Sequence, residues 1–273
     1  MTDAPSRTVL ITGAAGQVGR ILLDRPPRIG WRYVAFDLDE PEGVEGRDDV
    51  RCIVGSIADA EAVRQAMTGV TDVVHLAGVS SEDAWSRILD INVDGTRTVL
   101  EAARDAGVGR FVLASSNHAA GLWTRGEAPA GGLPDDATPR PDTFYGWSKA
   151  AAEDLLRLFC ERGDMRGVAV RIGHCFPEPR SGQRLAIWLS PRDARALVDA
   201  ALENDIPPFQ HVWGVSANTR GWLSSEGARR IGFTPRDDSE QFADRFDEEA
   251  IRVAPDAPLG AGFATAPLGE AMG

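Results

Sequence analysis

The chain has 273 residues, of which 43% are hydrophobic and 26% charged, and its formal net charge at pH 7 is −12. Such a chain can bury one large core, and its overall negative charge would repel a polyanion such as nucleic acid. Its three cysteines lack CxxC spacing, so we expect reduced thiols and no metal site. No segment is apolar for long enough to cross a membrane or to act as a signal peptide, which predicts a cytoplasmic protein.

Short apolar segments alternate with helix-like ones over much of the chain. Strands are predicted where a short apolar run is bounded by turn residues, at 8–12, 32–36, 50–54, 72–76, 110–114 and 168–172. Helices are predicted between them at 17–24, 58–67, 82–106 and 144–161. Strands that alternate with helices, without hairpin turns, predict an α/β fold with a Rossmann-type, doubly wound parallel sheet.

Two long loops, 117–143 and 173–191, interrupt this alternation. Each follows a predicted strand and should lie at the carboxyl edge of the sheet, where ligands bind in open α/β folds. Beyond them we predict a helix ending near residue 202, a strand at about 210–215, a helix near 224–231 and a polar tail.

Three spaced glycines follow the first predicted strand, in the segment Thr12–Gly19. Glycines at a strand-to-helix turn let the backbone approach a pyrophosphate. Asp37 ends the second strand, where a carboxylate can bond ribose hydroxyls and would repel a 2′-phosphate, so NAD is favoured over NADP. The residues expected at the cofactor are Gly13, Gly16, Gln17, Val18, Asp37, Leu38, Ser56, Ile57, Leu76, Ala77, Gly78, Asn92, Ser115, Tyr145, Lys149 and Ile172.

The candidate catalytic residues are Ser116, after the fifth strand, and Tyr145 and Lys149, in the helix that follows. Tyr145 and Lys149 are four residues apart and share one helix face. A lysine cation beside a phenol stabilises the phenolate and lowers the tyrosine pKa from about 10, which suits a general base near neutral pH. Ser116 would donate a hydrogen bond to the reacting oxygen.

The chain resembles the extended short-chain dehydrogenases, and among them the uronate dehydrogenase family, over nearly its whole length. The resemblance rests on the segments Ile11–Gln17, Ala114–His118, Val170–Gly173, Pro177–Pro179, Val212–Asn218 and Gly232–Pro235. It implies NAD-dependent oxidation of C1 of a pyranose uronic acid to a lactone. It also implies that Asn92, as a further catalytic residue, holds a water beside Lys149; the alternative is an asparagine that caps or kinks its helix. Ser56 departs from the family's usual aspartate. The substrate contacts implied are Ser80, Ser116, Asn117, His118 and Tyr145.

The loop expected to hold the C6 group of the sugar departs from the family pattern. His174 follows Arg171–Gly173 where the family has a serine, and the family's substrate arginine falls on Gln183, with Arg184 next. Arg180, Arg184 and His174 can all donate to an anion, so we expect substrate contacts from these three. The anion would be a carboxylate, a sulfonate as in sulfoquinovose, or a 6-phosphate. The alternative is that the arginines are solvated and His174 only fills space.

These expectations divide the chain into an NAD-binding Rossmann domain, 1–173, and a small substrate-side subdomain with a tail, 174–273, which is not expected to fold alone. Two other classes stay open. A nucleotide-sugar epimerase or dehydratase normally has a larger substrate domain, and a non-catalytic NAD-sensing protein would not need the Tyr-Lys pair. We expect a homo-oligomer that binds a small anionic sugar, without nucleic-acid or membrane partners.

Overall fold

Seven parallel strands form one sheet in the structure, a computed structural model that describes residues 7–272. The strand order is β3-β2-β1-β4-β5-β6-β9, with every neighbouring pair parallel. The strands are β1 (Arg7–Thr12), β2 (Trp31–Asp37), β3 (Val50–Val54), β4 (Asp72–His75), β5 (Arg110–Ser116), β6 (Arg166–Ile172) and β9 (Phe209–Gly214). The predicted Rossmann-type α/β fold is confirmed.

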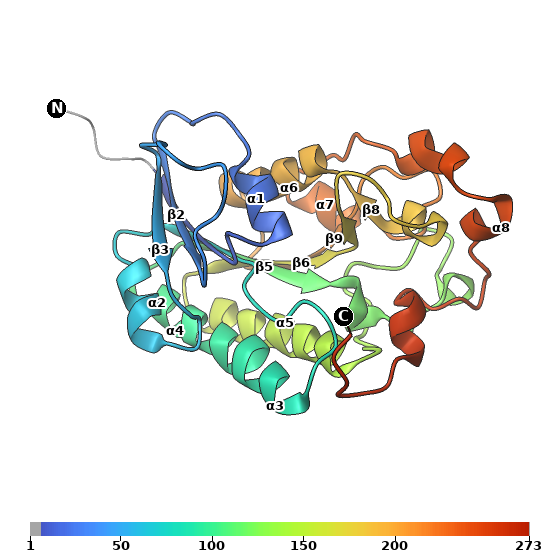
Figure 1. The fold of residues 1–273 in the computed structure, drawn as a ribbon, viewed down its shortest axis with the longest axis horizontal. Helices are drawn as coiled ribbons and strands as arrows, with labels where there is room; N and C mark the ends of the chain where they lie inside the picture. The colour runs from blue at the N-terminus through green and yellow to red at the C-terminus, as the bar shows by residue number, and fades with distance from the viewer. Residues whose placement is uncertain (1–6, 273) are drawn as a thin grey trace.

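Helices cover both faces of this sheet (Figure 1). One face carries α1 (Gln17–Leu23), α6 (Pro191–Glu203) and α7 (Glu226–Arg230), and the other α2 (Ala60–Ala66), α4 (Thr96–Asp105) and α5 (Phe144–Arg162). Alternate residues of a strand enter opposite cores, as Val9 and Ile11 do on one side of β1 and Leu10 on the other. Burying each such aliphatic side chain contributes about 1.5–3 kcal/mol. None of the helices within residues 7–272 is long and apolar enough to cross a membrane.

The segment predicted as one helix over 82–106 begins later and is not uniform. It consists of α3 (Trp85–Arg87), a π-helical stretch η1 (Ile88–Gly95) and α4. Glu82 lies outside the helix because its carboxylate binds backbone N–H groups of two other segments, those of Tyr145 and Gly269. π-helical turns are frequent at functional sites, and this one carries Asn92.

The chain beyond residue 173 returns to the main sheet, because α6 packs on it and β9 is its last strand. The division into a Rossmann domain, 1–173, and a substrate-side subdomain, 174–273, stays a prediction. A short two-stranded sheet pairs β7 (His174–Cys175) with β8 (Trp188–Leu189). The predicted polar tail contains short helical segments. They are η5 (Ser239–Arg245), α8 (Glu248–Ile251) and η6 (Ala261–Thr265), and other 3₁₀ turns are η2 (Asn117–Ala120), η3 (Arg125–Glu127) and η4 (Gly182–Ile187).

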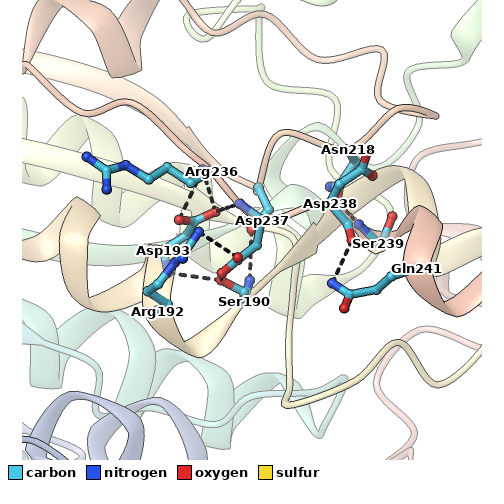
Figure 2. Close-up of polar contacts among 10 residues, drawn as sticks. Ser190, Arg192, Asp193, Asn218, Arg236, Asp237, Asp238, Ser239 and Gln241 are labelled. Atoms are coloured by element: carbon cyan, nitrogen blue, oxygen red, sulfur yellow. Dashed lines mark hydrogen bonds and ion pairs between the residues drawn. The ribbon is translucent and has the colours of Figure 1, made fainter.

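A hydrogen-bond network at the start of α6 holds the chain that leads into η5 (Figure 2). The buried Asp193 carboxylate accepts the backbone N–H groups of Arg236 and Asp237, at 3.0 and 2.9 Å. Ser190 caps α6 by accepting the N–H of Asp193, and its hydroxyl donates to the carboxylate of Asp237. The C-terminal third of the chain is therefore tied to a helix that packs directly on the sheet.

Candidate functional site

A cleft of about 680 Å³ lies at the carboxyl ends of the strands, a volume typical of ligand sites, which span about 300–1,000 Å³. Residues that follow β1 to β6 all contribute to its lining. Ser80 and Ser116 line it, as do all the predicted cofactor residues except Asn92. These are Gly13, Gly16, Gln17, Val18, Asp37, Leu38, Ser56, Ile57, Leu76, Ala77, Gly78, Ser115, Tyr145, Lys149 and Ile172.

The turn after β1 is built for close approach of a ligand to the backbone. Gly13 has φ +74°, and a Cβ there would lie 2.6 Å from the backbone nitrogen of Ala77, so only glycine fits. The Asp37 carboxylate accepts the N–H groups of Ala15 at 2.8 Å and Leu38 at 2.7 Å, which fixes it at the cleft. A bare backbone turn and a fixed carboxylate fit the pyrophosphate and the ribose of a dinucleotide.

Ser116, Tyr145 and Lys149 come together at the inner end of this cleft. Lys149 Nζ donates to the carbonyl oxygen of Ala114 at 3.0 Å and lies 5.7 Å from the centre of the Tyr145 ring. Burial lowers the pKa of Lys149 to about 8, against the opposing charge of Glu153. Burial also raises the pKa of Tyr145, and its hydrogen bond with Ser116 opposes this shift only in part. The Tyr145 pKa is therefore raised and not lowered as the sequence led us to expect, because desolvation of the phenol outweighs its hydrogen bond with Ser116.

Asn92 lies behind the cleft and fixes the loop that follows β4. Its Nδ2 donates to the carbonyl oxygen of Val79 and to Ser148 Oγ, both at 3.0 Å, and its Oδ1 accepts the N–H of Val79 at 2.7 Å. Both hydrogens of the amide and one lone pair of its oxygen are thus used within the protein. The water-holding role given to Asn92 stays a prediction.

Two side chains set the position of α5 and hence of Tyr145. Thr143 caps the helix by accepting the N–H of Gly146 at 3.0 Å. The buried Glu82 accepts the N–H of Tyr145 at 2.9 Å and that of Gly269 at 2.7 Å. Glu82 therefore joins α5 to the C-terminal segment of the chain.

A sealed cluster of charged groups lies one helical turn beyond Lys149. Glu153 binds Arg171 Nε and a terminal guanidinium nitrogen at 2.9 and 2.8 Å, and it also contacts His211 Nε2 at 3.2 Å and the Ser115 hydroxyl. All four residues are buried. Burial alone would raise the pKa of Glu153, but the hydrogen bonds from His211 and Arg171 outweigh it and lower that pKa to about 2. This cluster joins α5 to β5, β6 and β9.

The predicted substrate residues Asn117 and His118 lie in η2 and are covered by the C-terminal segment. Asn117 Nδ2 donates to the carbonyl oxygen of Leu259 at 3.3 Å. The rings of His118 and Phe263 stack with centres 4.0 Å apart, and His118 lies edge-on to Tyr145 at 5.8 Å. The part of the chain expected to be a polar tail therefore packs on His118, which in turn contacts Tyr145.

Of the three predicted anion donors, Arg184 lines a cavity. This cavity measures about 220 Å³ and lies between η4 and the C-terminal segment that includes Leu259. Arg184 is the one charged side chain among the described residues that line it. Its guanidinium forms no hydrogen bond or ion pair within residues 7–272, while burial lowers its pKa and the nearby Asp142 opposes that shift. An unpaired, partly buried cation of this kind suits an anionic ligand.

His174 and Arg180 line neither cavity. His174 Nε2 accepts the N–H of Arg180 at 3.2 Å, and its ring packs on Phe176. Burial, together with the charges of Arg184 and Arg180, lowers the pKa of His174 to about 4, so it is neutral at pH 7. The guanidinium of Arg180 stacks over Phe176 at 3.7 Å. Direct contact of these two residues with the substrate stays a prediction, and the geometry favours the space-filling alternative for His174.

Four residues near the site were not predicted: Glu82, Asp142, Glu153 and Phe263. Glu153 repeats the spacing of Tyr145 and Lys149 once more along the helix, and this pattern could have identified it. The other three act across distant segments, which no local pattern reveals.

Comparison with known proteins agrees with a dinucleotide site at this cleft. The sequence pattern of the NAD dependent epimerase/dehydratase family matches residues 9–216. Uronate dehydrogenase of Pseudomonas syringae is 33% identical over 273 residues, which cover 98% of each chain. NAD-dependent glucose-6-phosphate dehydrogenase of Haloferax volcanii is 38% identical over 251 residues, 86% of this chain and 95% of that one.

The fold has a close match among solved structures. A crystal structure of a mutant uronate dehydrogenase from Agrobacterium tumefaciens, complexed with NAD, has a TM-score of 0.86 at 32% identity. The match covers 96% of this chain and 98% of that one. The resemblance to uronate dehydrogenases is thereby confirmed. With its glycine turn, Asp37 and the Ser-Tyr-Lys arrangement at one cleft, this chain belongs to the NAD-dependent epimerase/dehydratase family.

Proposed function

We propose that this protein is an NAD-dependent sugar dehydrogenase that oxidises the anomeric C1 of a hexuronate to its lactone. The observation that carries the choice of substrate is Arg184, whose guanidinium has no partner within the described residues and faces a small cavity. A guanidinium pairs with a planar carboxylate through two parallel hydrogen bonds. The relatives named uronate dehydrogenase support the same substrate class.

The C-terminal segment contacts both the cavity of Arg184 and the turn η2 that follows Ser116. Leu259 lines the cavity, and its carbonyl oxygen accepts the hydrogen bond from Asn117, which adjoins Ser116 in the chain. A sugar with its C1 hydroxyl at Tyr145 and its C6 carboxylate at Arg184 would therefore be bounded by η2 on one side and the C-terminal segment on the other.

The residues of this chain would act on the proton of the C1 hydroxyl. Tyr145 accepts that proton at its phenolic oxygen as the phenolate, so the phenol must first release its own proton, which its raised pKa disfavours. Ser116 holds the same substrate oxygen by a hydrogen bond. Lys149 supplies a positive charge close to the phenol, since a pKa of about 8 leaves it mostly protonated at pH 7. When NAD⁺ is bound in the cleft, it accepts the hydride from C1.

A hexose 6-phosphate is the second candidate, and a specific observation favours it. The Haloferax volcanii relative, at 38% identity, is an NAD-dependent glucose-6-phosphate dehydrogenase. The cavity lining argues for the carboxylate instead, because it offers one cation among the described residues, and a phosphate dianion binds best to several charged donors.

The test is to incubate the protein with NAD⁺ and each of galacturonate, glucuronate, glucose 6-phosphate and sulfoquinovose, and to follow the absorbance of the reduced cofactor. We expect the highest kcat/KM with a uronate. A higher value with glucose 6-phosphate would establish the second candidate. Reduction with none of them would refute a C1 dehydrogenase of anionic hexoses and favour an epimerase or an NAD-sensing protein.

The Tyr145→Phe variant tests the chemistry within the same assay. Removal of the phenolic oxygen should lower kcat by at least about 10²-fold while NAD⁺ affinity changes little, because the ring itself is retained. NAD⁺ binding is measured by calorimetry as the control. Activity equal to that of the wild type would contradict the role of Tyr145.

A further inference from the structure

The carboxylate of Asp142 is sealed beside the catalytic residues and takes no part in the steps above. Its side chain is 0% exposed, and its Oδ2 lies 2.7 Å from His118 Nδ1. Its Oδ1 accepts a hydrogen bond from the Thr143 hydroxyl at 3.0 Å. Burying an unpaired carboxylate costs free energy, and His118 is the partner that this geometry gives to Asp142.

Three glycines from separate segments close around this carboxylate. A Cβ at Gly121 or Gly260 would overlap the Asp142 carboxylate, and one at Gly146 would lie 2.9 Å from its Oδ1. The backbone N–H of Gly260 also donates to the carbonyl oxygen of Gly121 at 2.9 Å. The pair of Asp142 and His118 is therefore held rigidly, and the C-terminal segment completes its enclosure.

The pairing determines which nitrogen of His118 carries the proton. An ionised carboxylate only accepts hydrogen bonds, so His118 Nδ1 must donate to it. In the neutral imidazole, Nε2 then holds a lone pair and acts as an acceptor. Within residues 7–272 this nitrogen has no hydrogen-bond partner, and its ring lies edge-on to that of Tyr145.

We propose that Asp142 is a positioning residue that holds His118 in the Nδ1–H tautomer, so that Nε2 accepts a hydrogen bond from the substrate hydroxyl next to the oxidised carbon. The substrate half of this statement rests on the proposed function, in which the neighbouring hydroxyl is that of C2. A substrate without this hydroxyl would leave a desolvated acceptor unpaired and would be selected against. His118 thus recognises the sugar hydroxyl, and Asp142 determines the tautomer with which His118 binds it.

The variant Asp142→Asn should reverse the tautomer for a structural reason. The Thr143 hydroxyl accepts the N–H of Gly146 and donates toward residue 142, so it attracts the amide oxygen of an asparagine. The amide NH₂ then faces His118 Nδ1, which must become the acceptor, and the proton moves to Nε2. In the double variant Asp142→Asn/Thr143→Val the amide is free to turn, and its oxygen can again accept from Nδ1–H.

The tautomer is measured without any substrate, by ¹⁵N NMR of protein with labelled histidines. The chain has four histidines, and the His118→Asn variant assigns the signal. We expect neutral His118 to be protonated at Nδ1 in the wild type, at Nε2 in Asp142→Asn, and again at Nδ1 in the double variant. The Nε2–H form in the wild type, or no change in Asp142→Asn, would overturn the proposal. Thr143→Val alone is the matched control for the lost helix cap.

The kinetic test compares a hexuronate with its 2-deoxy analogue. In the wild type, loss of the hydroxyl should lower kcat/KM by about 10–100-fold, as for a hydrogen bond to a buried acceptor. In Asp142→Asn, Nε2–H can only donate to this hydroxyl instead of accepting from it, so the ratio between the two substrates should move away from its wild-type value. An equal ratio in both proteins would overturn the proposal. If the wild type oxidises no hexuronate, the proposed function fails, while the NMR result still decides the role of Asp142.

Discussion

Two groups of charged side chains differ in how the fold pairs them. The first consists of Glu153, Arg171 and His211, in which every charged group is hydrogen-bonded to another and all are buried. The second is Arg184 alone, which has no partner within the described residues and faces a cavity.

The difference lies in whether the protein itself completes the pairing. A buried ion pair with all of its hydrogen bonds satisfied adds rigidity between elements, here between α5 and strands β5, β6 and β9. A buried charge without a partner costs stability in the free protein, and that cost is recovered when an anion binds. Mutations in the first group should therefore change the free energy of unfolding, and mutations in the second should change the affinity for the substrate.

The largest effect is expected when the paired cluster is broken. Glu153→Leu leaves Arg171 and His211 buried without their carboxylate, and should lower the free energy of unfolding by about 3–5 kcal/mol. Urea-induced unfolding followed by circular dichroism measures this loss. Asp154→Leu, on the exposed neighbour in the same helix, is the matched control and should change stability by less than about 0.5 kcal/mol. Equal losses in the two variants would mean that the cluster does not bind α5 to the sheet.

The next effect concerns the unpaired charge. Arg184→Gln should raise KM for the anionic sugar by about 10–100-fold, corresponding to about 1.4–2.8 kcal/mol of binding, with little change in KM for NAD⁺. The free energy of unfolding should stay the same or rise slightly, since a partly buried cation is removed. Steady-state kinetics with each substrate varied in turn gives both constants.

Arg180→Gln is the control for the Arg184 variant. Arg180 is exposed and lines neither cavity, although it stacks on Phe176 at the edge of the larger one, so its removal should change KM by less than about twofold if the comparison holds. A large increase in KM for Arg180→Gln, with none for Arg184→Gln, would transfer the anion contact from Arg184 to Arg180.

The same contrast explains how far the sequence alone could predict this molecule. The strands are short apolar runs with clear ends, and β3 was predicted with the bounds observed. The cofactor side of the cleft follows from them, because residues such as Gly13 and Asp37 lie directly after strands that share one edge. Each contact there is set by local backbone geometry.

The substrate side could not be predicted in the same way. Asp142 and His118 are 24 residues apart across a loop without periodicity, and Phe263 reaches His118 from a segment that looked like a polar tail. Such pairings depend on how irregular segments pack, and their composition carries no periodic signal. The loop 173–191 contains three candidate anion donors in the sequence, but only its packing reveals that His174 is bonded to the backbone of Arg180.

His75 extends the comparison to a buried base that stays neutral. Its two ring nitrogens lie 2.7 Å from the Thr12 hydroxyl and 3.0 Å from the Thr96 hydroxyl. Burial, with a contribution from the charge of Lys149, lowers the pKa of His75 to about 3, whereas an unfolded histidine has a pKa of about 6.5. Between these values the unfolded chain binds more protons, so this group's contribution to stability rises with pH and is lost as pH falls below about 6.5.

The variant His75→Gln isolates that contribution. Glutamine can still bond the two threonine hydroxyls but does not titrate, so the free energy of unfolding should depend less steeply on pH from about pH 5 to about pH 6.5, by up to about 1.4 kcal/mol per pH unit. Above about pH 7.5, where histidine is neutral in both states, wild type and variant should differ only by a constant offset. Urea unfolding at several pH values measures both slopes. Parallel curves across the whole range would show that His75 is protonated to the same extent in the folded and unfolded chains, and its hydrogen bonds with Thr12 and Thr96 would then have to be compatible with a charged ring.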